Sequence, residues 1–328
     1  KTLQAEDEIA GICTAIGAAF AGDLAVTTTS GPGLSLKSEA LGLAVMTELP
    51  LVIVDVQRGG PSTGLPTKTE QTDLDQALYG RNGECPIPVI AAHSPAHCFD
   101  AAFTAAKIAL EHMTPVMLLS EGFIGNGSEP WKIPSMSEYP EIKPPFFHGA
   151  LQDGERFQPY ERDPETLVRR WAIPGQKGLE HRIGGLEKDH QGVLSTDPVN
   201  HETMVRERAE KVDRIAAFIP ELELHGPKQG KLLVVSWGGT FGHVFSAWRQ
   251  FEGQDVAFAH FDFIKPLPRN TREVFGSYEK ILVCELNSGQ FAGYLRAEMP
   301  EFHYEKFNKV QGQPFLVSEI ARAIKDNL

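Results

Sequence analysis

Residues 51–67, Leu-Val-Ile-Val-Asp-Val-Gln-Arg-Gly-Gly-Pro-Ser-Thr-Gly-Leu-Pro-Thr, decide the fold of this chain. The run Leu51–Val56 is almost continuously apolar, which is typical of a parallel strand covered on both faces. The loop that follows is rich in glycine and proline and contains Arg58. Since ligands bind at the carboxyl ends of the strands in open parallel sheets, we expect this loop to line a binding crevice.

Strand-like and helix-like patterns alternate on both sides of this stretch. We predict further strands at 24–29, 89–92 and 115–120, a turn at 30–33, and helices at 8–20, 34–47 and 96–111. A second unit begins at residue 231, with strands at 231–236, 256–261 and 280–284, a glycine loop at 238–242 and a helix at 244–251. This alternation predicts an α/β fold built from two parallel-sheet domains.

The region between the two units has a different composition. Prolines at 130, 134, 140, 144 and 145 and many charged residues predict a long irregular connection, which includes a helix at 201–218. The predicted organisation is therefore a first domain at 1–125, a linker at 126–226 and a second domain at 227–328.

Composition and charge exclude several classes of protein. The chain has 328 residues, enough for two domains, and its net charge of -12 argues against nucleic acid as a partner. It contains no apolar run of about 20 residues, as a membrane span requires, and its polar start does not resemble a secretory signal. We therefore expect a cytoplasmic enzyme without membrane or nucleic-acid partners.

The residues that most often bind metals are widely scattered. The four cysteines, at 13, 85, 98 and 284, do not have the close spacing of zinc or iron–sulfur ligands. The histidines at 181, 190 and 201 lie far apart in a polar stretch, which favours exposed side chains. We assign no metal ligand to this chain and expect any redox centre to lie on another one.

Glu8 begins a helix of small residues, and a strand and the turn Thr29-Ser-Gly-Pro-Gly33 follow it. By itself, an acidic residue in a first helical turn is explained by the helix dipole. Together these features resemble the pyrimidine-binding domain of thiamine diphosphate enzymes. In that superfamily the glutamate hydrogen-bonds the aminopyrimidine ring, and a glycine follows it by nine residues, as Gly17 follows Glu8. Gly17 would allow close helix packing, and the glycines of the turn would let backbone approach a ligand.

Arg58 offers a planar pair of donors that matches a carboxylate. An isolated arginine in a glycine-rich loop is usually a surface residue, but here three glycines allow sharp bends and small hydroxyls accompany it, at Ser62, Thr63 and Thr67. We interpret the loop as a carboxylate-binding site.

The longer pattern resembles the alpha subunit of the 2-oxoacid:ferredoxin oxidoreductases. The similarity covers nearly the whole chain and is carried by residues 29–33, 57–67, 83–86, 184–192, 237–240, 265–268, 285–287 and 289–296. The family implies a pyrimidine-binding domain, here truncated at its start, and a transketolase C-terminal-like domain. It also implies CoA-dependent oxidative decarboxylation of a 2-oxoacid, or the reverse reductive carboxylation, with electrons passing to or from ferredoxin. The pattern is closest to the 2-oxoglutarate enzymes, which form succinyl-CoA and CO2; pyruvate and branched-chain 2-oxoacids are the alternatives.

The resemblance also assigns roles to residues. Glu8 would activate thiamine diphosphate, with Ser30, Gly31 and Gly33 against the cofactor, while Arg58 and Thr67 would bind the substrate. The chain departs from the family because it begins after the position of the substrate loop Tyr-Pro-Ile-Thr-Pro and has no Gly-Asp-Gly motif. In the family a beta subunit carries the diphosphate site, Mg2+ and a [4Fe-4S] cluster. We therefore expect a beta subunit, an upstream gamma domain or subunit and ferredoxin as partners.

Two other classes of function remain open at this stage. The sequence Gly238-Gly239-x-x-Gly242 follows a strand, and Asp262 lies near the position of a ribose-binding acid, so the second unit partly resembles a dinucleotide-binding dehydrogenase domain. The chain could also be a non-catalytic scaffold for a sister subunit.

Overall fold

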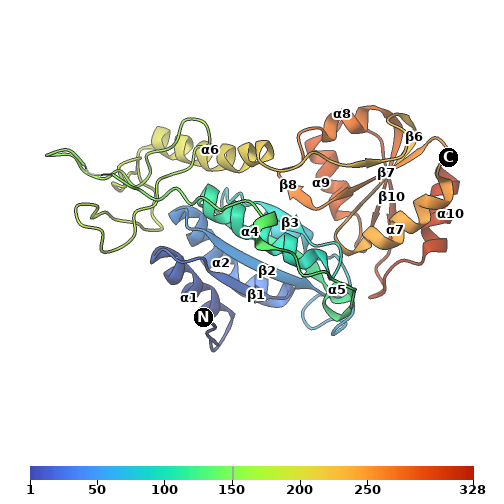
Figure 1. Ribbon diagram of the computed structural model, residues 1–328, viewed down its shortest axis with the longest axis horizontal. Coiled ribbons are helices and arrows are strands. Elements are labelled where there is room, and N and C mark those ends of the chain that lie inside the picture. Colours follow the sequence, from blue (N-terminus) through green and yellow to red (C-terminus); the bar gives the residue numbers. More distant parts are fainter. Residues whose placement is uncertain (150) are drawn as a thin grey trace.

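The computed structural model describes residues 1–149 and 151–328, which form two five-stranded sheets lying side by side (Figure 1). The first sheet has the order β1-β2-β4-β3-β8. Its strands are β1 (Val26–Thr29), β2 (Leu51–Gln57), β4 (Pro115–Glu121), β3 (Val89–Ala91) and β8 (Phe263–Lys265). All neighbours are parallel except β3 and β8, which pair antiparallel. The predicted α/β fold is confirmed.

Helices cover both faces of the first sheet. On one face, α1 (Glu8–Phe20) and α2 (Gly31–Thr47) pack against Leu51 and Ile53 of β2, and on the other, α4 (His97–His112) packs against Val52. This double cover explains the continuous apolar run of β2. Asp7 caps α1 by accepting a hydrogen bond from the Ala10 amide at 2.8 Å.

The second sheet has the order β10-β9-β6-β7-β5. It consists of β10 (Tyr304–Asn308), β9 (Tyr278–Glu285), β6 (Gly230–Trp237), β7 (Val256–Phe261) and the antiparallel edge strand β5 (Leu224–His225). On one face, α7 (Phe241–Trp248) and α10 (Val317–Asn327) cover Leu232 and Val234. On the other, α9 (Gln290–Glu298) packs against Leu233 and Val235, and α8 (Thr271–Gly276) lies nearby.

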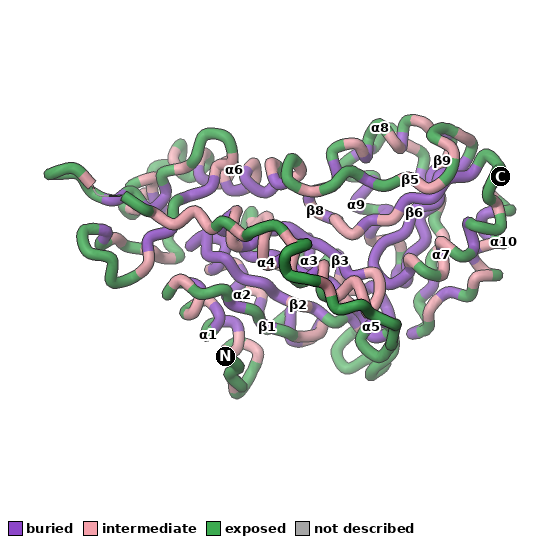
Figure 2. The backbone as a smooth tube through the Cα atoms, in the orientation of Figure 1, coloured by how far each residue is buried: buried purple, intermediate pink, exposed green. Residues whose placement is uncertain are grey.

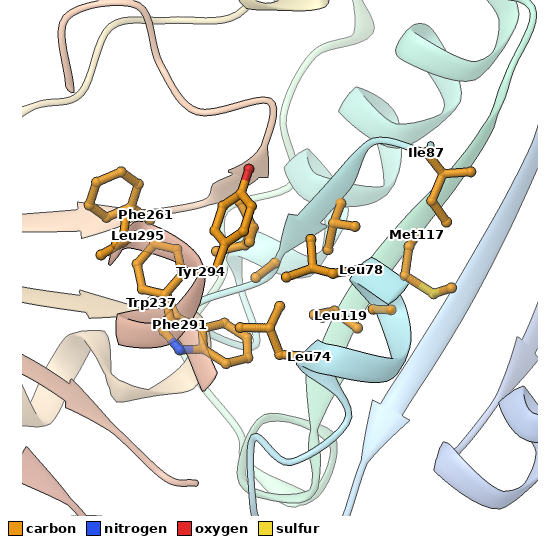
Figure 3. Close-up of a cluster of buried hydrophobic side chains, with 14 of the residues drawn as sticks. Leu74, Leu78, Ile87, Met117, Leu119, Trp237, Phe261, Phe291, Tyr294 and Leu295 are labelled. Atoms are coloured by element: carbon orange, nitrogen blue, oxygen red, sulfur yellow. The ribbon is translucent and has the colours of Figure 1, made fainter. Parts of the chain in front are cut away.

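The two sheets share a hydrophobic core. Figure 3 shows Leu74 and Leu78, from α3 (Leu74–Tyr79), facing Trp237, Phe291 and Tyr294 of the second half. Strand β8 also belongs to the second half of the chain and extends the first sheet. The division at residues 125 and 226 stays a prediction, because core and sheet pairing both continue from one half into the other.

The connection between the halves is irregular, as predicted. It follows α5 (Gly122–Asn126), contains the short 3₁₀ helix η1 (Met136–Glu138) and leads into α6 (Pro198–Arg214) and η2 (Ile215–Ala217). Figure 2 shows that much of it is exposed, in contrast to the buried strands. Its anchor is the buried Glu48 carboxylate, which accepts hydrogen bonds from Arg162 at 2.6 and 2.8 Å and from Lys211 at 2.6 Å.

Two expected loops are wrong in their bounds. The predicted turn at 30–33 is the first turn of α2, which tolerates Pro32 because the amides of a first turn lack helical partners. The glycine loop at 238–242 is the 3₁₀ helix η3 (Gly238–Thr240) joined directly to α7, which therefore starts at Phe241 rather than at 244. The 3₁₀ helix η4 (Arg249–Phe251) follows α7. In the described part of the chain, no helix combines the length and apolar character needed to cross a membrane.

Candidate active site at the carboxyl edge of the first sheet

Strands β1 and β2 run parallel, so Ser30, the N-cap residue of α2, and Arg58, the first residue after β2, lie at the same edge of the sheet. A hollow of about 380 Å³ opens there. It is lined by Gly31, Pro32, Ser35, Arg58, Gly60, Pro61, Ser62, Glu70, Thr72, Asp73, Gln76 and Val310. The predicted crevice therefore exists, and Val310 brings the second half of the chain to it.

Arg58 is half-buried in this hollow. Its guanidinium Nε is shielded from solvent and has no hydrogen-bond partner among residues 1–149 and 151–328. A buried donor without a partner is costly, which favours binding of an anionic acceptor. The first turn of α2 lines the same hollow with Gly31 and Pro32, and the amino end of a helix also attracts negative charge.

The acids around Arg58 have raised pKa values. Burial raises the pKa of Asp73 to about 6 and raises the pKa of Glu70 above its ordinary value. Burial, together with the charge of Asp73, also raises the pKa of Asp55, which is fully buried near the end of β2. The sequence reasoning assigned no role to these acids, because their protonation depends on burial.

Glu8 lies against the start of α2. A Cβ added to Gly33 would lie 2.8 Å from Glu8 Cγ and 2.0 Å from Thr29 Oγ1, so only glycine fits there. The buried side chain of Lys37 donates hydrogen bonds to the Glu8 carbonyl at 3.0 Å and to Thr27 Oγ1 at 3.1 Å. Lys37, which the sequence reasoning missed, therefore holds Glu8 at the carboxyl edge of β1.

The glycines of this region have different roles from one another. Gly31 approaches Asp73 closely, since an added Cβ would lie 2.5 Å from its Oδ1. Residues 30–33 thus contact Glu8 at one end and line the Arg58 hollow at the other. For Gly17 the prediction of close packing is wrong within the described residues of this chain, none of which lies within 4 Å of an added Cβ. Ser30 is the N-cap residue of α2, and its side chain makes no capping hydrogen bond.

Thr67 does not line the hollow with Arg58 as we expected. It is exposed at a backbone φ of 58°, and its hydroxyl donates to the adjacent Pro66 carbonyl at 2.7 Å. The loop folds back on itself through Leu65, whose amide donates to the Gly59 carbonyl at 2.8 Å. This reversal takes Thr67 away from the hollow, and its role in substrate binding stays a prediction.

Gln71 attaches the Arg58 loop to the second half of the chain. Its side chain is fully buried, donates to the Trp237 carbonyl at 2.7 Å and accepts from the Leu286 amide at 2.9 Å. Its backbone carbonyl accepts a further bond from Asn287 Nδ2 at 2.7 Å. The only sequence signal for this contact was that residues 71 and 285–287 lie near or within the family pattern.

The second glycine motif does not form a phosphate cradle. Gly238 and Gly239 are buried, and added Cβ atoms would lie 2.9 Å from Gln71 Nε2 and 2.1 Å from Glu121 Oε1, respectively. Asp262, the expected ribose-binding acid, pairs with His93 at 2.8 Å. The glycines make room for packing between the two halves, so the dinucleotide interpretation is wrong.

Comparison with known proteins now places the chain. Residues 1–196 match the family model described as "Pyruvate flavodoxin/ferredoxin oxidoreductase, thiamine diP-bdg". The chain belongs to this family. The resemblance to 2-oxoacid:ferredoxin oxidoreductase alpha subunits inferred from the motifs is therefore confirmed.

Individual relatives agree with this assignment. The chain is 54% identical to the 2-oxoglutarate oxidoreductase subunit KorA of Mycobacterium tuberculosis, over 99% of this chain and 49% of that protein. It is 32% identical to the 2-oxoglutarate synthase subunit KorA of Methanothermobacter marburgensis, over 98% of this chain and 85% of that protein. The chain thus spans about half the length of the Mycobacterium relative.

Solved structures support both the family and the fold. A 2-oxoglutarate:ferredoxin oxidoreductase from Magnetococcus marinus, with 2-oxoglutarate, coenzyme A and succinyl-CoA bound, superposes with a TM-score of 0.93 at 33% identity. That match covers 100% of this chain and 57% of the other. A split-gene transketolase matches with a TM-score of 0.50 at 12% identity, over 97% of this chain and 80% of that one, which shows a shared fold.

Proposed function

We propose that this chain is the alpha part of a 2-oxoglutarate:ferredoxin oxidoreductase. The enzyme would convert 2-oxoglutarate and CoA to succinyl-CoA and CO2, or run the reverse carboxylation, and exchange electrons with ferredoxin. The observation that carries this proposal is Arg58, whose buried Nε has no hydrogen-bond partner in the described part of the chain and lies in a hollow beside Glu8. Relatives named for 2-oxoglutarate favour this substrate over pyruvate and branched-chain 2-oxoacids.

In this proposal the chain supplies half of a shared site. Thiamine diphosphate would supply the nucleophilic carbon and the electron sink. The residues present fit its pyrimidine half, because the side chain of Glu8 lies against Gly33, where a side chain would otherwise block close approach. Glu8 would exchange a proton with the ring, Ser30, Gly31 and Gly33 would contact the cofactor, and Arg58 would orient the substrate carboxylate.

The remaining parts of the enzyme would come from elsewhere. A beta subunit would carry the diphosphate site, Mg2+ and a [4Fe-4S] cluster, and a gamma domain or subunit would complete the cytoplasmic complex. This division agrees with the absence of a Gly-Asp-Gly motif from the sequence. It also explains why Arg58 lies at an open edge of the fold rather than in a closed pocket.

The substrate role of Arg58 is tested by substitution in the assembled enzyme. Each charged hydrogen bond contributes about 1.5–3 kcal/mol, so loss of a bidentate pair in Arg58→Ala should lower kcat/KM for 2-oxoglutarate roughly 10²- to 10⁴-fold. Arg58→Lys, which keeps the charge but not the fork, should be intermediate. The assay is reduction of a viologen dye over a panel of 2-oxoacids. The matched control is Arg322→Ala, an exposed arginine on α10. A kcat/KM for Arg58→Ala equal to that of this control would refute the proposal, whereas a pyruvate preference in the native enzyme would refute only the substrate.

Glu8 and Thr67 need separate measurements. Glu8→Gln should lower kcat by about 10²-fold or more, because general acid–base groups contribute about 10²–10⁴-fold. Calorimetry of thiamine diphosphate binding should show that this variant still binds the cofactor. Thr67→Ala should raise KM for 2-oxoglutarate if the partner subunit closes the loop onto the substrate. An unchanged KM would remove Thr67 from the site.

A further inference from the structure

Three side chains of the types that can bind metals meet where the second half of the chain joins the first sheet. His93 lies two residues beyond β3, His260 belongs to β7, and Asp262 connects β7 to β8. Asp262 Oδ1 lies 2.8 Å from His93 Nδ1 and 3.5 Å from His260 Nε2. One ligand atom from each of the three lies within 4.8 Å of the others. None of these residues lines the hollow around Arg58.

His260 is oriented as a metal ligand would be. Its side chain is only 7% exposed, and its Nδ1 lies 2.7 Å from the Ser236 hydroxyl. When Nδ1–H donates to Ser236, the lone pair of Nε2 points toward Asp262. That Nε2 is buried and has no hydrogen-bond partner in the described residues. Metal-bound histidines are typically held by such a bond from the other ring nitrogen.

The donor types of the cluster also suit a cation. One carboxylate and two imidazoles are offered together, and these are oxygen and nitrogen ligands that zinc takes in proteins.

The surroundings leave one side of the cluster open. Phe241 packs against the rings of His93 and His260, with centroids 4.9 and 5.0 Å away. His97 stacks on His93 at 3.8 Å, and its Nε2 lies 3.9 Å from the second oxygen of Asp262. His97 and Asp262 also line a hollow of about 360 Å³, through which an ion and a water molecule can enter.

We propose that His93 Nδ1, His260 Nε2 and Asp262 bind one zinc ion, with water as the fourth ligand. Zinc takes nitrogen and oxygen ligands at about 2.0–2.2 Å in a tetrahedron, which separates the ligand atoms by about 3.4 Å. The observed 2.8 and 3.5 Å are close to this value, so small side-chain shifts suffice. The ion would link β3 to the β7–β8 segment and thus join the two halves beside their antiparallel pairing.

The sequence contains no local signal for this site. The histidines at 181, 190 and 201 do not belong to the cluster, and we had expected no metal ligand in the chain. His93 and Asp262 are 169 residues apart, so only folding brings them together.

The test compares zinc content and thermal stability in the purified enzyme. After mild chelation, addition of zinc and removal of the excess, mass spectrometry should find one zinc per chain more in the native protein than in His260→Ala or His93→Gln. Other metal sites contribute equally to the native protein and the variants, so they do not affect the difference in zinc content. The matched control His303→Ala, an exposed histidine paired with Glu305, should keep the native zinc content. Zinc should raise the Tm of the native protein and of the control by several degrees and leave the ligand variants unchanged, and magnesium should have no such effect.

Diffraction at the zinc absorption edge provides a second readout. Anomalous density between His93, His260 and Asp262 would support the proposal even if one variant folds poorly. Equal zinc content in native and variant proteins, with no density at the cluster, would overturn it. The three side chains would then form only a hydrogen-bonded contact between the halves.

Discussion

Glu121 should make the stability of this protein fall as the pH rises. It is the last residue of β4, 1% exposed, with both carboxylate oxygens buried and close to Gly239 in the interface between the halves. Burial raises its pKa from 4.5 to about 8, and the nearby Thr69 hydroxyl offsets only part of this effect. The folded protein therefore keeps a proton at neutral pH that the unfolded chain releases.

The size and sign of the effect follow from this difference. Below pH 4.5 the carboxyl is protonated in both states and does not alter the free energy of unfolding. Between pH 4.5 and 8 only the folded state holds the proton, so stability decreases with rising pH and levels off above 8. At about 1.4 kcal/mol for each pH unit, the complete loss is about 5 kcal/mol.

Glu121→Gln removes this dependence, because an amide is neutral throughout the range. Any misfit of the amide affects stability equally at every pH. The quantity to measure is therefore the free energy of unfolding of the variant minus that of the native protein, followed as the pH changes. Urea unfolding at pH 4, 7 and 9 should show the variant gaining about 5 kcal/mol relative to the native protein across the range. Glu252→Gln, at an exposed position, is the control. If the free energies of unfolding of Glu121→Gln and the native protein differ by the same amount at pH 4 and pH 9, Glu121 is ionised in the fold and the prediction is wrong.

Three further predictions concern buried contacts. Glu48→Gln leaves two buried cations without their carboxylate and should lower the free energy of unfolding by about 3–5 kcal/mol in urea titrations at pH 7. The cationic partners of Glu48 outweigh the effect of burial and lower its pKa. Its contribution to the free energy of unfolding is therefore complete above pH 4.5 and declines at lower pH, as the carboxylate becomes protonated. Gly33→Ala places a methyl 2.0 Å from Thr29 Oγ1, so it should cost about 1–3 kcal/mol and weaken thiamine diphosphate binding in calorimetry. Gln71→Ala leaves the Leu286 amide without its partner and should lower the free energy of unfolding by at least about 1–3 kcal/mol. It should also raise KM for 2-oxoglutarate, because Gln71 holds the Arg58 loop. A KM equal to the native value would show that this contact does not affect substrate binding.

Local sequence patterns were sufficient to locate the main helices and strands and to place Arg58, but not Thr67, in the candidate site. The apolar run at residue 51 identified β2, and small residues identified α1, because strand and helix periods are visible within a few residues. Arg58 could be placed at the carboxyl edge for the same reason, since a loop that follows a parallel strand must emerge there. Thr67 was misplaced because the loop reverses at Leu65, and that reversal depends on a backbone contact with Gly59.

The sequence by itself determined the α/β class, the family and the position of Arg58, because these depend on residue order and on motifs read over short distances. Only the tertiary structure decided which polar groups keep their charge and which partners they meet. Gln71 meets Trp237 across 166 residues, and His93 meets Asp262 across 169. The raised pKa values of Asp55 and Glu121 likewise depend on burial by distant segments. The physical reason is that desolvation and side-chain pairing are set by the three-dimensional surroundings of a group, which neighbours in the sequence do not specify.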